Sequence, residues 1–129
     1  MRKIKGLLID VKTDPGMVVE KELDDDILES YYDVLQCNVM DIVVRNIDGT
    51  PYNIVCDDEG LFDEKPIVSA VDQNYQPMLV GNLFVCNDDG EGRLTSLTEE
   101  DLQKILPHII IRASRLGEAI HFAPCLMLD

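Results

Sequence analysis

Short runs of apolar residues, separated by polar turn signals, predict several β-strands in this chain. Residues 4–11 form the first strand-like run, and residues 17–23 alternate loosely between apolar and polar positions. Between them, Asp14-Pro15-Gly16 is typical of a turn, because proline presets φ and glycine tolerates positive φ. The pattern predicts a β-hairpin over residues 4–23.

A second hairpin is the clearest strand pair in the sequence. Residues 39–47 and 52–57 read as its strands, and residues 48–51 read as its loop. The near-continuous apolar run 77–86 predicts a central strand, in which Gly81 indicates a bulge or a close backbone approach.

Residues 61–76 lack a regular pattern. Pro66 and Asn74 punctuate this stretch, and its short apolar run covers residues 67–71. We therefore expect an irregular connection before the central strand.

Two helices are predicted from polar starts followed by apolar faces. The first is expected to begin at the aspartates 24–26, which suit the positive end of a helix dipole, and to end near Gln36. Its apolar face is predicted to contain Ile27, Leu28, Tyr31 and Leu35. The second begins at Thr98, where Asp101 completes a capping box, and carries a stripe of Leu102, Ile105, Leu106, Ile109 and Ile110.

Pro107 leaves two alternatives for the segment after the second helix. A kinked helix would continue to about Leu116 and stop at Gly117. Alternatively, residues 108–111 form a strand, because three consecutive isoleucines favour one. The apolar tail, residues 119–128, is expected to pack on the domain in either case.

Together these elements predict one α+β domain over residues 1–129, with a mixed or antiparallel sheet covered by two or three helices. The core strands are expected at 39–47, 52–57 and 77–86, covered by the helix that starts at Thr98. A chain of 129 residues with 46% hydrophobic residues is long enough to bury a real core. Its aromatic content is only 5%, so the core must rest on aliphatic side chains.

The cysteines and the apolar runs suggest a cytoplasmic protein. Neither a signal peptide nor a run long enough to span a bilayer is recognisable, so no membrane association is expected. The four cysteines lack C-x-x-C spacing, and three lie in strand-like apolar runs. We expect all four to be unpaired and at least three to be buried: Cys37, Cys56, Cys86 and Cys125.

Charge is the most unusual property of the sequence. The net charge is −14, and residues 13–101 contain four basic and 22 acidic residues, which give −18. Such a surface repels nucleic acid and attracts a basic protein or a cation. The simpler interpretation is that the charge only keeps the protein dispersed in solution.

Several segments of the chain resemble an uncharacterised family of small acidic domains from phages, plasmids and Gram-positive bacteria. The resemblance covers roughly residues 39–106 and rests on the order of two strands around an acidic turn, a glycine-containing apolar strand and a Ser-Leu-Thr-acidic helix start. These segments are 41–45, 52–60, 77–86 and 94–102. The resemblance implies an α+β domain on a mobile element and provides no catalytic residues, and the stretches before 39 and after 106 depart from it.

No residue pattern in the chain is typical of a known chemistry. His108 and His121 are the only two histidines, and the chain has no C-x-x-C pair, so packed or surface positions are expected for both. Residues 87–92 resemble the start of a calcium loop, but Thr98 stands where the bidentate Glu is required. P-loop, G-x-S-x-G and G-x-G-x-x-G motifs are absent from the sequence. We predict no catalytic, cofactor-binding or metal-binding residue.

The leading hypothesis is a non-enzymatic binding or regulatory protein of a mobile element, whose partner is another protein with a basic surface. One specific form is nucleic-acid mimicry, in which spaced carboxylates imitate phosphates. The alternatives are a small metal-dependent enzyme that uses carboxylates and a purely structural or assembly protein. The candidate partner-binding residues form four acidic clusters: Asp24, Asp25 and Asp26; Asp57, Asp58 and Glu59; Asp88, Asp89 and Glu91; and Glu99, Glu100 and Asp101.

Overall fold

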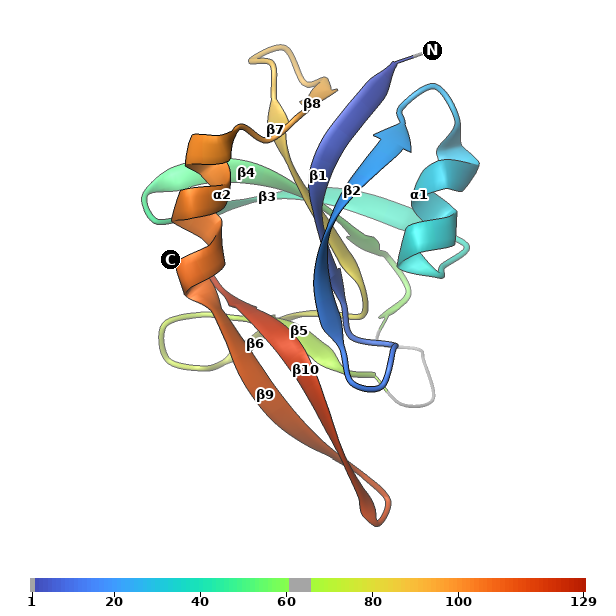
Figure 1. Cartoon of the computed structure of the whole chain (residues 1–129), viewed down its shortest axis with the longest axis vertical. Coiled ribbons are helices and arrows are strands. Elements are labelled where there is room, and N and C mark those ends of the chain that lie inside the picture. The colour runs from blue at the N-terminus through green and yellow to red at the C-terminus, as the bar shows by residue number, and fades with distance from the viewer. Residues whose placement is uncertain (1, 61–65) are drawn as a thin grey trace.

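The computed structural model describes residues 2–60 and 66–129, and it is dominated by β-strands (Figure 1). Strands account for 53% of the described residues and helices for 15%. The predicted α+β domain, with one sheet under two or three helices, is therefore wrong. The physical reason is that the second half of the chain, from residue 66 onward, forms mostly strands, and four of these strands build a second sheet.

The larger sheet has the strand order β2-β1-β7-β4-β3, and the short β8 also pairs with β7. Its strands pair antiparallel throughout. Both predicted hairpins are confirmed as its β1–β2 and β3–β4 pairs. The strand bounds are β1 (Lys3–Asp10), β2 (Met17–Asp24), β3 (Met40–Ile47), β4 (Thr50–Asp57), β7 (Leu83–Asp88) and β8 (Leu94–Thr95).

The smaller sheet has the order β6-β5-β10-β9. Its β5 and β10 run parallel, whereas its other pairs are antiparallel. The β9–β10 hairpin extends away from the rest of the molecule in Figure 1. The strand bounds are β5 (Val68–Val71), β6 (Pro77–Val80), β9 (Ile109–Leu116) and β10 (Ala119–Met127).

The larger sheet separates two hydrophobic cores. Helix α1 (Leu28–Leu35) packs Tyr31 and Leu35 against one face, where Phe84 meets Tyr31 edge-on with ring centroids 6.0 Å apart. Helix α2 (Glu99–Ile105) and the smaller sheet share the other core, in which Leu102 and Ile105 pack. No helix in the described residues is long and apolar enough to cross a membrane.

The predicted central strand 77–86 is two strands in two different sheets. The chain breaks at Gly81, whose φ is +78°, so that β6 lies at the edge of the smaller sheet and β7 in the middle of the larger one. Asn82 fixes the break: its buried amide accepts from the Val11 N–H at 2.9 Å and donates to the Val34 carbonyl at 3.0 Å. A continuous apolar pattern conceals this change of sheet.

The segment after Pro107 is a strand, and the kinked-helix alternative is wrong. A short 3₁₀ turn, η2 (Leu106–His108), follows α2, and β9 then runs to Leu116. The β-branched residues 109–111 pair antiparallel with β10; Ile110, for example, lies opposite Cys125. Gly117, with φ of +66°, lies in the β9–β10 turn instead of ending a helix.

The first helix begins later than predicted. Asp24 still belongs to β2, and its side chain accepts from the Asp26 N–H, so these aspartates form a turn. The N-cap of α1 is Ile27, without a side-chain cap, and both Ile27 and Leu28 are exposed. By contrast, the capping box predicted at the start of α2 is confirmed.

Candidate functional site

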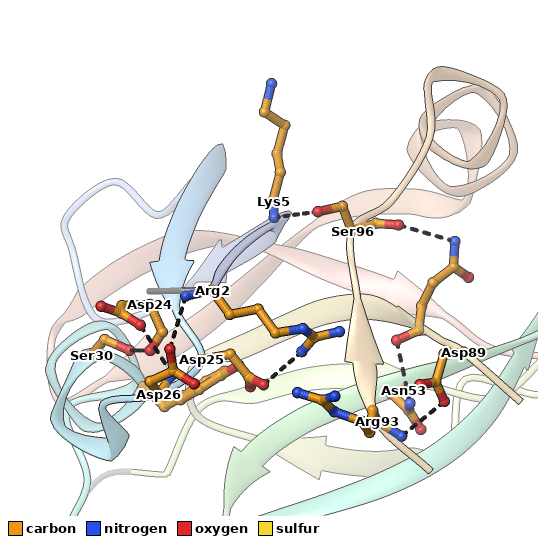
Figure 2. Close-up of polar contacts among 12 residues, drawn as sticks. Arg2, Lys5, Asp24, Asp25, Asp26, Ser30, Asn53, Asp89, Arg93 and Ser96 are labelled. Atoms are coloured by element: carbon orange, nitrogen blue, oxygen red, sulfur yellow. Dashed lines mark hydrogen bonds and ion pairs between the residues drawn. The ribbon is translucent and has the colours of Figure 1, made fainter. Parts of the chain in front are cut away.

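The first acidic cluster, residues 24–26, is tied to Arg2, which immediately precedes β1 (Figure 2). The Arg2 guanidinium lies 2.7 Å from the Asp25 carboxylate, and the Arg2 backbone N–H donates to Asp26 at 2.9 Å. Asp25 also accepts from the Tyr31 hydroxyl at 2.6 Å. Burial, followed by this hydrogen bond, raises the pKa of Tyr31 well above its usual range.

The second cluster, Asp88, Asp89 and Glu91, caps its own loop. Asp88 accepts from the Gly90 N–H, and one Asp89 oxygen accepts from the backbone of Glu91 and Arg93. The hydrogen bond from Glu91, then that from Arg93, lowers the pKa of Asp89. Within the described residues, no group of three or more His, Cys, Asp or Glu side chains has the geometry to hold a metal ion.

In the third cluster, Asp101 joins the start of α2 to the larger sheet. Its carboxylate accepts from the Thr98 backbone and hydroxyl at 2.8 Å, and also from the Asn87 amide at 2.6 Å and the Tyr52 hydroxyl at 2.9 Å. Burial acts to raise the pKa of Asp101, but these hydrogen bonds outweigh it and lower the pKa. Glu99 and Glu100 are exposed.

The structure brings three of the four clusters to the same region of the larger sheet, with cations among them. Figure 2 shows Arg2 and Asp25 on the same side of the larger sheet as Asp89 and Arg93, and the charges of both arginines act to lower the pKa of Asp89. Asn87 links the second cluster to the third through Asp101. The fourth cluster, residues 57–59, lies at the other end of β4 from Tyr52, and Asp57 accepts from the Glu59 N–H.

A groove between the β1–β2 hairpin and α2 is the most promising site in the described part of the chain. In Figure 1, α2 stands to one side of this hairpin. The cavity volume is about 340 Å³. Four apolar side chains and three polar ones line it: Leu7, Val18, Leu102 and Leu106, with Glu20, Glu99 and Gln103.

The strand register explains how the groove forms. Leu7 lies opposite Glu20, and Ile9 opposite Val18, so these side chains share the face of the sheet that carries α2. Helix α2 packs Leu102 and Ile105 into the core but stops short of edge strand β2. Leu106 remains 48% exposed at the rim.

The charges at the groove are predominantly negative. Glu20 and Glu99 are both exposed, one on each wall. Lys104 of α2 is directed away, because its ammonium donates to the Thr50 hydroxyl at 3.3 Å. Lys5 lies farther along the same face, opposite Glu22 in the β1–β2 register. An apolar floor with a carboxylate on each wall suits a ligand that is apolar on one side and cationic on the other.

The two histidines contribute to packing and surface contacts. His121 is buried, with Nε2 2.7 Å from the Val11 carbonyl and Nδ1 3.5 Å from the Asp14 carboxylate. His108 is partly exposed, with Nε2 3.9 Å from the Asp48 carboxylate. These contacts agree with the packed and surface positions expected from the sequence.

The cysteine predictions are confirmed: all four thiols are free, with Cys56, Cys86 and Cys125 buried and Cys37 half-buried. Burial raises the pKa of Cys56 to about 11 and that of Cys86 to about 12, and nearby carboxylates add to both shifts. Burial also raises the pKa of Cys37 and of Cys125.

Sequence reasoning missed the groove, although part of its signal was visible. Leu102 and Leu106 were recognised as a helical stripe, and Val18 and Glu20 as alternating strand positions. What the pattern lacked was the pairing of these two surfaces, because the residues that face each other lie about eighty positions apart in the sequence.

Comparison with known proteins identifies the chain only at the level of a family. A family model described as a domain of unknown function (DUF3846) matches residues 4–109. The match begins in β1 and includes α1, so the family extends well beyond the expected 39–106. No curated protein and no solved structure matches the chain.

Proposed function

We propose that this chain, which belongs to the DUF3846 family of domains of unknown function, is a non-enzymatic protein that binds a basic, amphipathic segment of a protein partner. The observation that carries the proposal is the groove between β1–β2 and α2, with its apolar floor and acidic walls.

The apolar floor of the groove is expected to provide most of the binding free energy through the hydrophobic effect. Val18 is half-buried and Leu106 half-exposed, so both retain apolar surface that a ligand can cover. Covering one leucine-sized side chain contributes about 1.5–3 kcal/mol. An amphipathic helix laid into such a groove is a common mode of protein recognition.

The acidic walls of the groove and the net negative charge of the molecule favour a ligand of positive charge. Glu20 and Glu99 lie at the groove itself, and the chain as a whole carries −14. Such a field speeds the approach of a cationic segment and repels nucleic acid and acidic segments. Exposed ion pairs contribute little affinity, so the apolar contacts supply most of it.

Nucleic-acid mimicry and a mobile-element setting stay predictions. The region where three acidic clusters meet contains Arg2 and Arg93, and Arg2 is already paired with Asp25. That arrangement supports a mixed-charge surface more than a row of phosphate-like carboxylates, so the groove is the better basis for a proposal. The enzymatic and assembly alternatives also stay predictions.

The test uses a synthetic amphipathic peptide of leucine and lysine, titrated into the protein and followed by calorimetry and by NMR shifts. Binding is expected at the groove and should weaken as salt is raised, because screening shortens the range of the charges. A peptide of the same composition in scrambled order, and one with glutamate in place of lysine, should bind more weakly.

Two substitutions locate the site. Leu106→Asp should weaken binding by about tenfold or more, because it replaces an apolar contact with a charge. Val44→Asp is the matched control, since Val44 is 59% exposed on β3, away from the groove. Equal binding by both variants, or equal binding of the lysine and glutamate peptides, would refute the proposed function.

A further inference from the structure

We infer that β9 is a self-association edge, which pairs antiparallel with β9 of a second copy around a two-fold axis at Ala113. This inference is independent of the groove, because it rests on the β9–β10 hairpin. A failure of peptide binding at the groove would therefore leave self-association through β9 unaffected, and the reverse also holds.

The direction of the backbone groups on β9 follows from one hydrogen bond. The Phe122 carbonyl accepts from the Gly16 N–H at 2.9 Å, so it faces away from β9. Phe122 lies opposite Ala113, which makes this a pair that exchanges no hydrogen bonds within the hairpin. The N–H and C=O of Ala113 therefore face the free edge, as do those of Ile111 and Arg115 by alternation.

This edge lacks most of the usual protections against pairing. Edge strands are commonly blunted by proline, charged side chains (lysine above all), a bulge or short length; β9 contains Arg112 and Arg115, but it has eight residues in unbroken register, with neither proline nor lysine. Among the described strands, none pairs with its outer side. Its exposed face is also apolar: Ile111 is 69% exposed, and Ile120 and Phe122, on the same face, are 56% and 53% exposed.

The sequence of β9 is self-complementary in one register. With Ala113 at the axis, Ile111 lies opposite the partner's Arg115, and Arg112 lies opposite the partner's Ser114. Ile110 then lies opposite the partner's Leu116, so no like charges face each other and the aliphatic stem of arginine covers Ile111. In the register with Arg112 at the axis, two guanidinium groups would face each other.

Charge also favours a second copy at this edge. Two chains of net charge −14 repel each other over most of their surfaces. The hairpin is the exception, because residues 109–127 contain Arg112 and Arg115 against Glu118, a net +1. A two-fold arrangement through β9 keeps the acidic parts apart and closes after two copies.

The test is the mass of the full chain in solution as a function of protein concentration, measured by sedimentation and light scattering. The mass should rise from 14.5 kDa toward twice that value, and more readily at higher salt. Hydrogen exchange should slow with concentration at the amides of Ile111, Ala113 and Arg115, and stay unchanged at Arg112 and Ser114.

Substitution of the axial residue tests the register. Ala113→Pro removes an N–H that the hairpin does not use, so it should keep the fold by circular dichroism and abolish association. Ala113→Ser retains the N–H and should still associate, whereas Ala113→Lys places two cations at the axis and should not. A mass that stays at one chain at the highest concentration, or association unchanged by Ala113→Pro and Ala113→Lys, would overturn the inference and leave the edge to a strand of another protein.

Discussion

At the scale of single residues, the Asp101 carboxylate connects the start of α2 to two strands of the larger sheet. It caps α2 through Thr98 and accepts from Tyr52 and Asn87 on the larger sheet. Because Tyr52 lies 49 positions away in the sequence, this carboxylate fastens a local helix start to a distant strand.

Replacing Asp101 by alanine should lower the free energy of unfolding by about 1–2 kcal/mol, since the Asp101 half of the capping box is lost and Tyr52 and Asn87 lose an acceptor. Glu100→Ala, in the same turn but exposed, is the control and should have little effect. Chemical denaturation of both variants measures the difference.

The pH dependence of that difference has a defined sign. The pKa of Asp101 is lowered below its ordinary value of 3.8 in the folded protein. Its contribution to stability is therefore fully present above the unfolded pKa and is lost as pH falls through the folded one. The gap between wild type and Asp101→Ala should shrink below about pH 4, and a gap that widened there would contradict this assignment.

The thiols offer a second prediction at the residue scale. Raised pKa values keep Cys56 and Cys86 protonated near neutral pH, and burial shields them from reagents. With a thiol-specific chromogenic reagent, the folded protein should react slowly, with Cys37 first, and denaturant should release all four groups at once. Rapid reaction of Cys86 in the folded protein would refute its burial.

Residue-level features were predictable where they depend on neighbours in sequence. The Thr98–Asp101 box and the Asp48-Gly49 turn involve residues three or fewer positions apart, and both were recognised. The Arg2–Asp25 ion pair and the Tyr52–Asp101 hydrogen bond were not, because only the folded sheet brings these residues together.

At the scale of elements, the paired strands β1 and β7 approach each other closely at Gly6. A Cβ at Gly6 would clash with Cζ of Phe84 and lie 2.6 Å from the Val85 carbonyl oxygen. By contrast, a Cβ at Gly49 or Gly81 meets nothing within 4 Å, although both residues have positive φ. These glycines are therefore required for different reasons.

The two kinds of glycine predict a rank order of stability. Gly6→Ala should cost about 1–3 kcal/mol or more, because the central strands must move apart. Gly49→Ala and Gly81→Ala should each cost about 1–2 kcal/mol from backbone strain alone. Thermal unfolding of the three variants measures the order, and a Gly6→Ala variant as stable as wild type would contradict the close approach.

Element types were predictable where apolar alternation and turn signals agree, as in the two hairpins. The predictions failed where one apolar pattern is compatible with two different structures. The stripe through Ile109 and Ile110 suits a helix, but pairing with β10 makes these residues a strand. The run 77–86 looks like one strand because it is almost entirely apolar, yet Gly81 and Asn82 divide it.

At the scale of the whole molecule, the excess of negative charge opposes compaction. With −14 on a single small chain, self-repulsion favours expanded states, and salt screens it. The melting temperature should rise by several degrees between about 10 mM and about 300 mM sodium chloride. Glu59→Gln with Glu91→Gln, both exposed, should reduce this dependence, and a melting temperature indifferent to salt would refute the repulsion.

The larger architecture was the least predictable part. Composition and patterning indicated a compact domain with strands, but not that the strands divide between two sheets. That division depends on pairings such as Leu126 with Ala70, which lie far apart in the sequence. The local sequence around either residue does not indicate which strand it will pair with.

The central position of β7 has a consequence for how quickly the chain folds. The β1–β2 and β3–β4 hairpins each form between strands that are close in sequence, but only β7 joins the two hairpins in the larger sheet. Val85 of β7 pairs with Leu7 of β1, and Phe84 of β7 pairs with Val55 of β4. Pairing β7 with β1 and with β4 closes two long loops of the chain, and the entropy of closure is lost before the stabilising contacts form. Insertion of β7 should therefore be the rate-limiting event of folding. In stopped-flow measurements Val85→Ala should mainly slow folding, whereas Leu126→Ala, in the smaller sheet, should mainly speed unfolding. The opposite pattern would mean that the smaller sheet assembles first, and that the strand at the centre of the structure is the last to enter it.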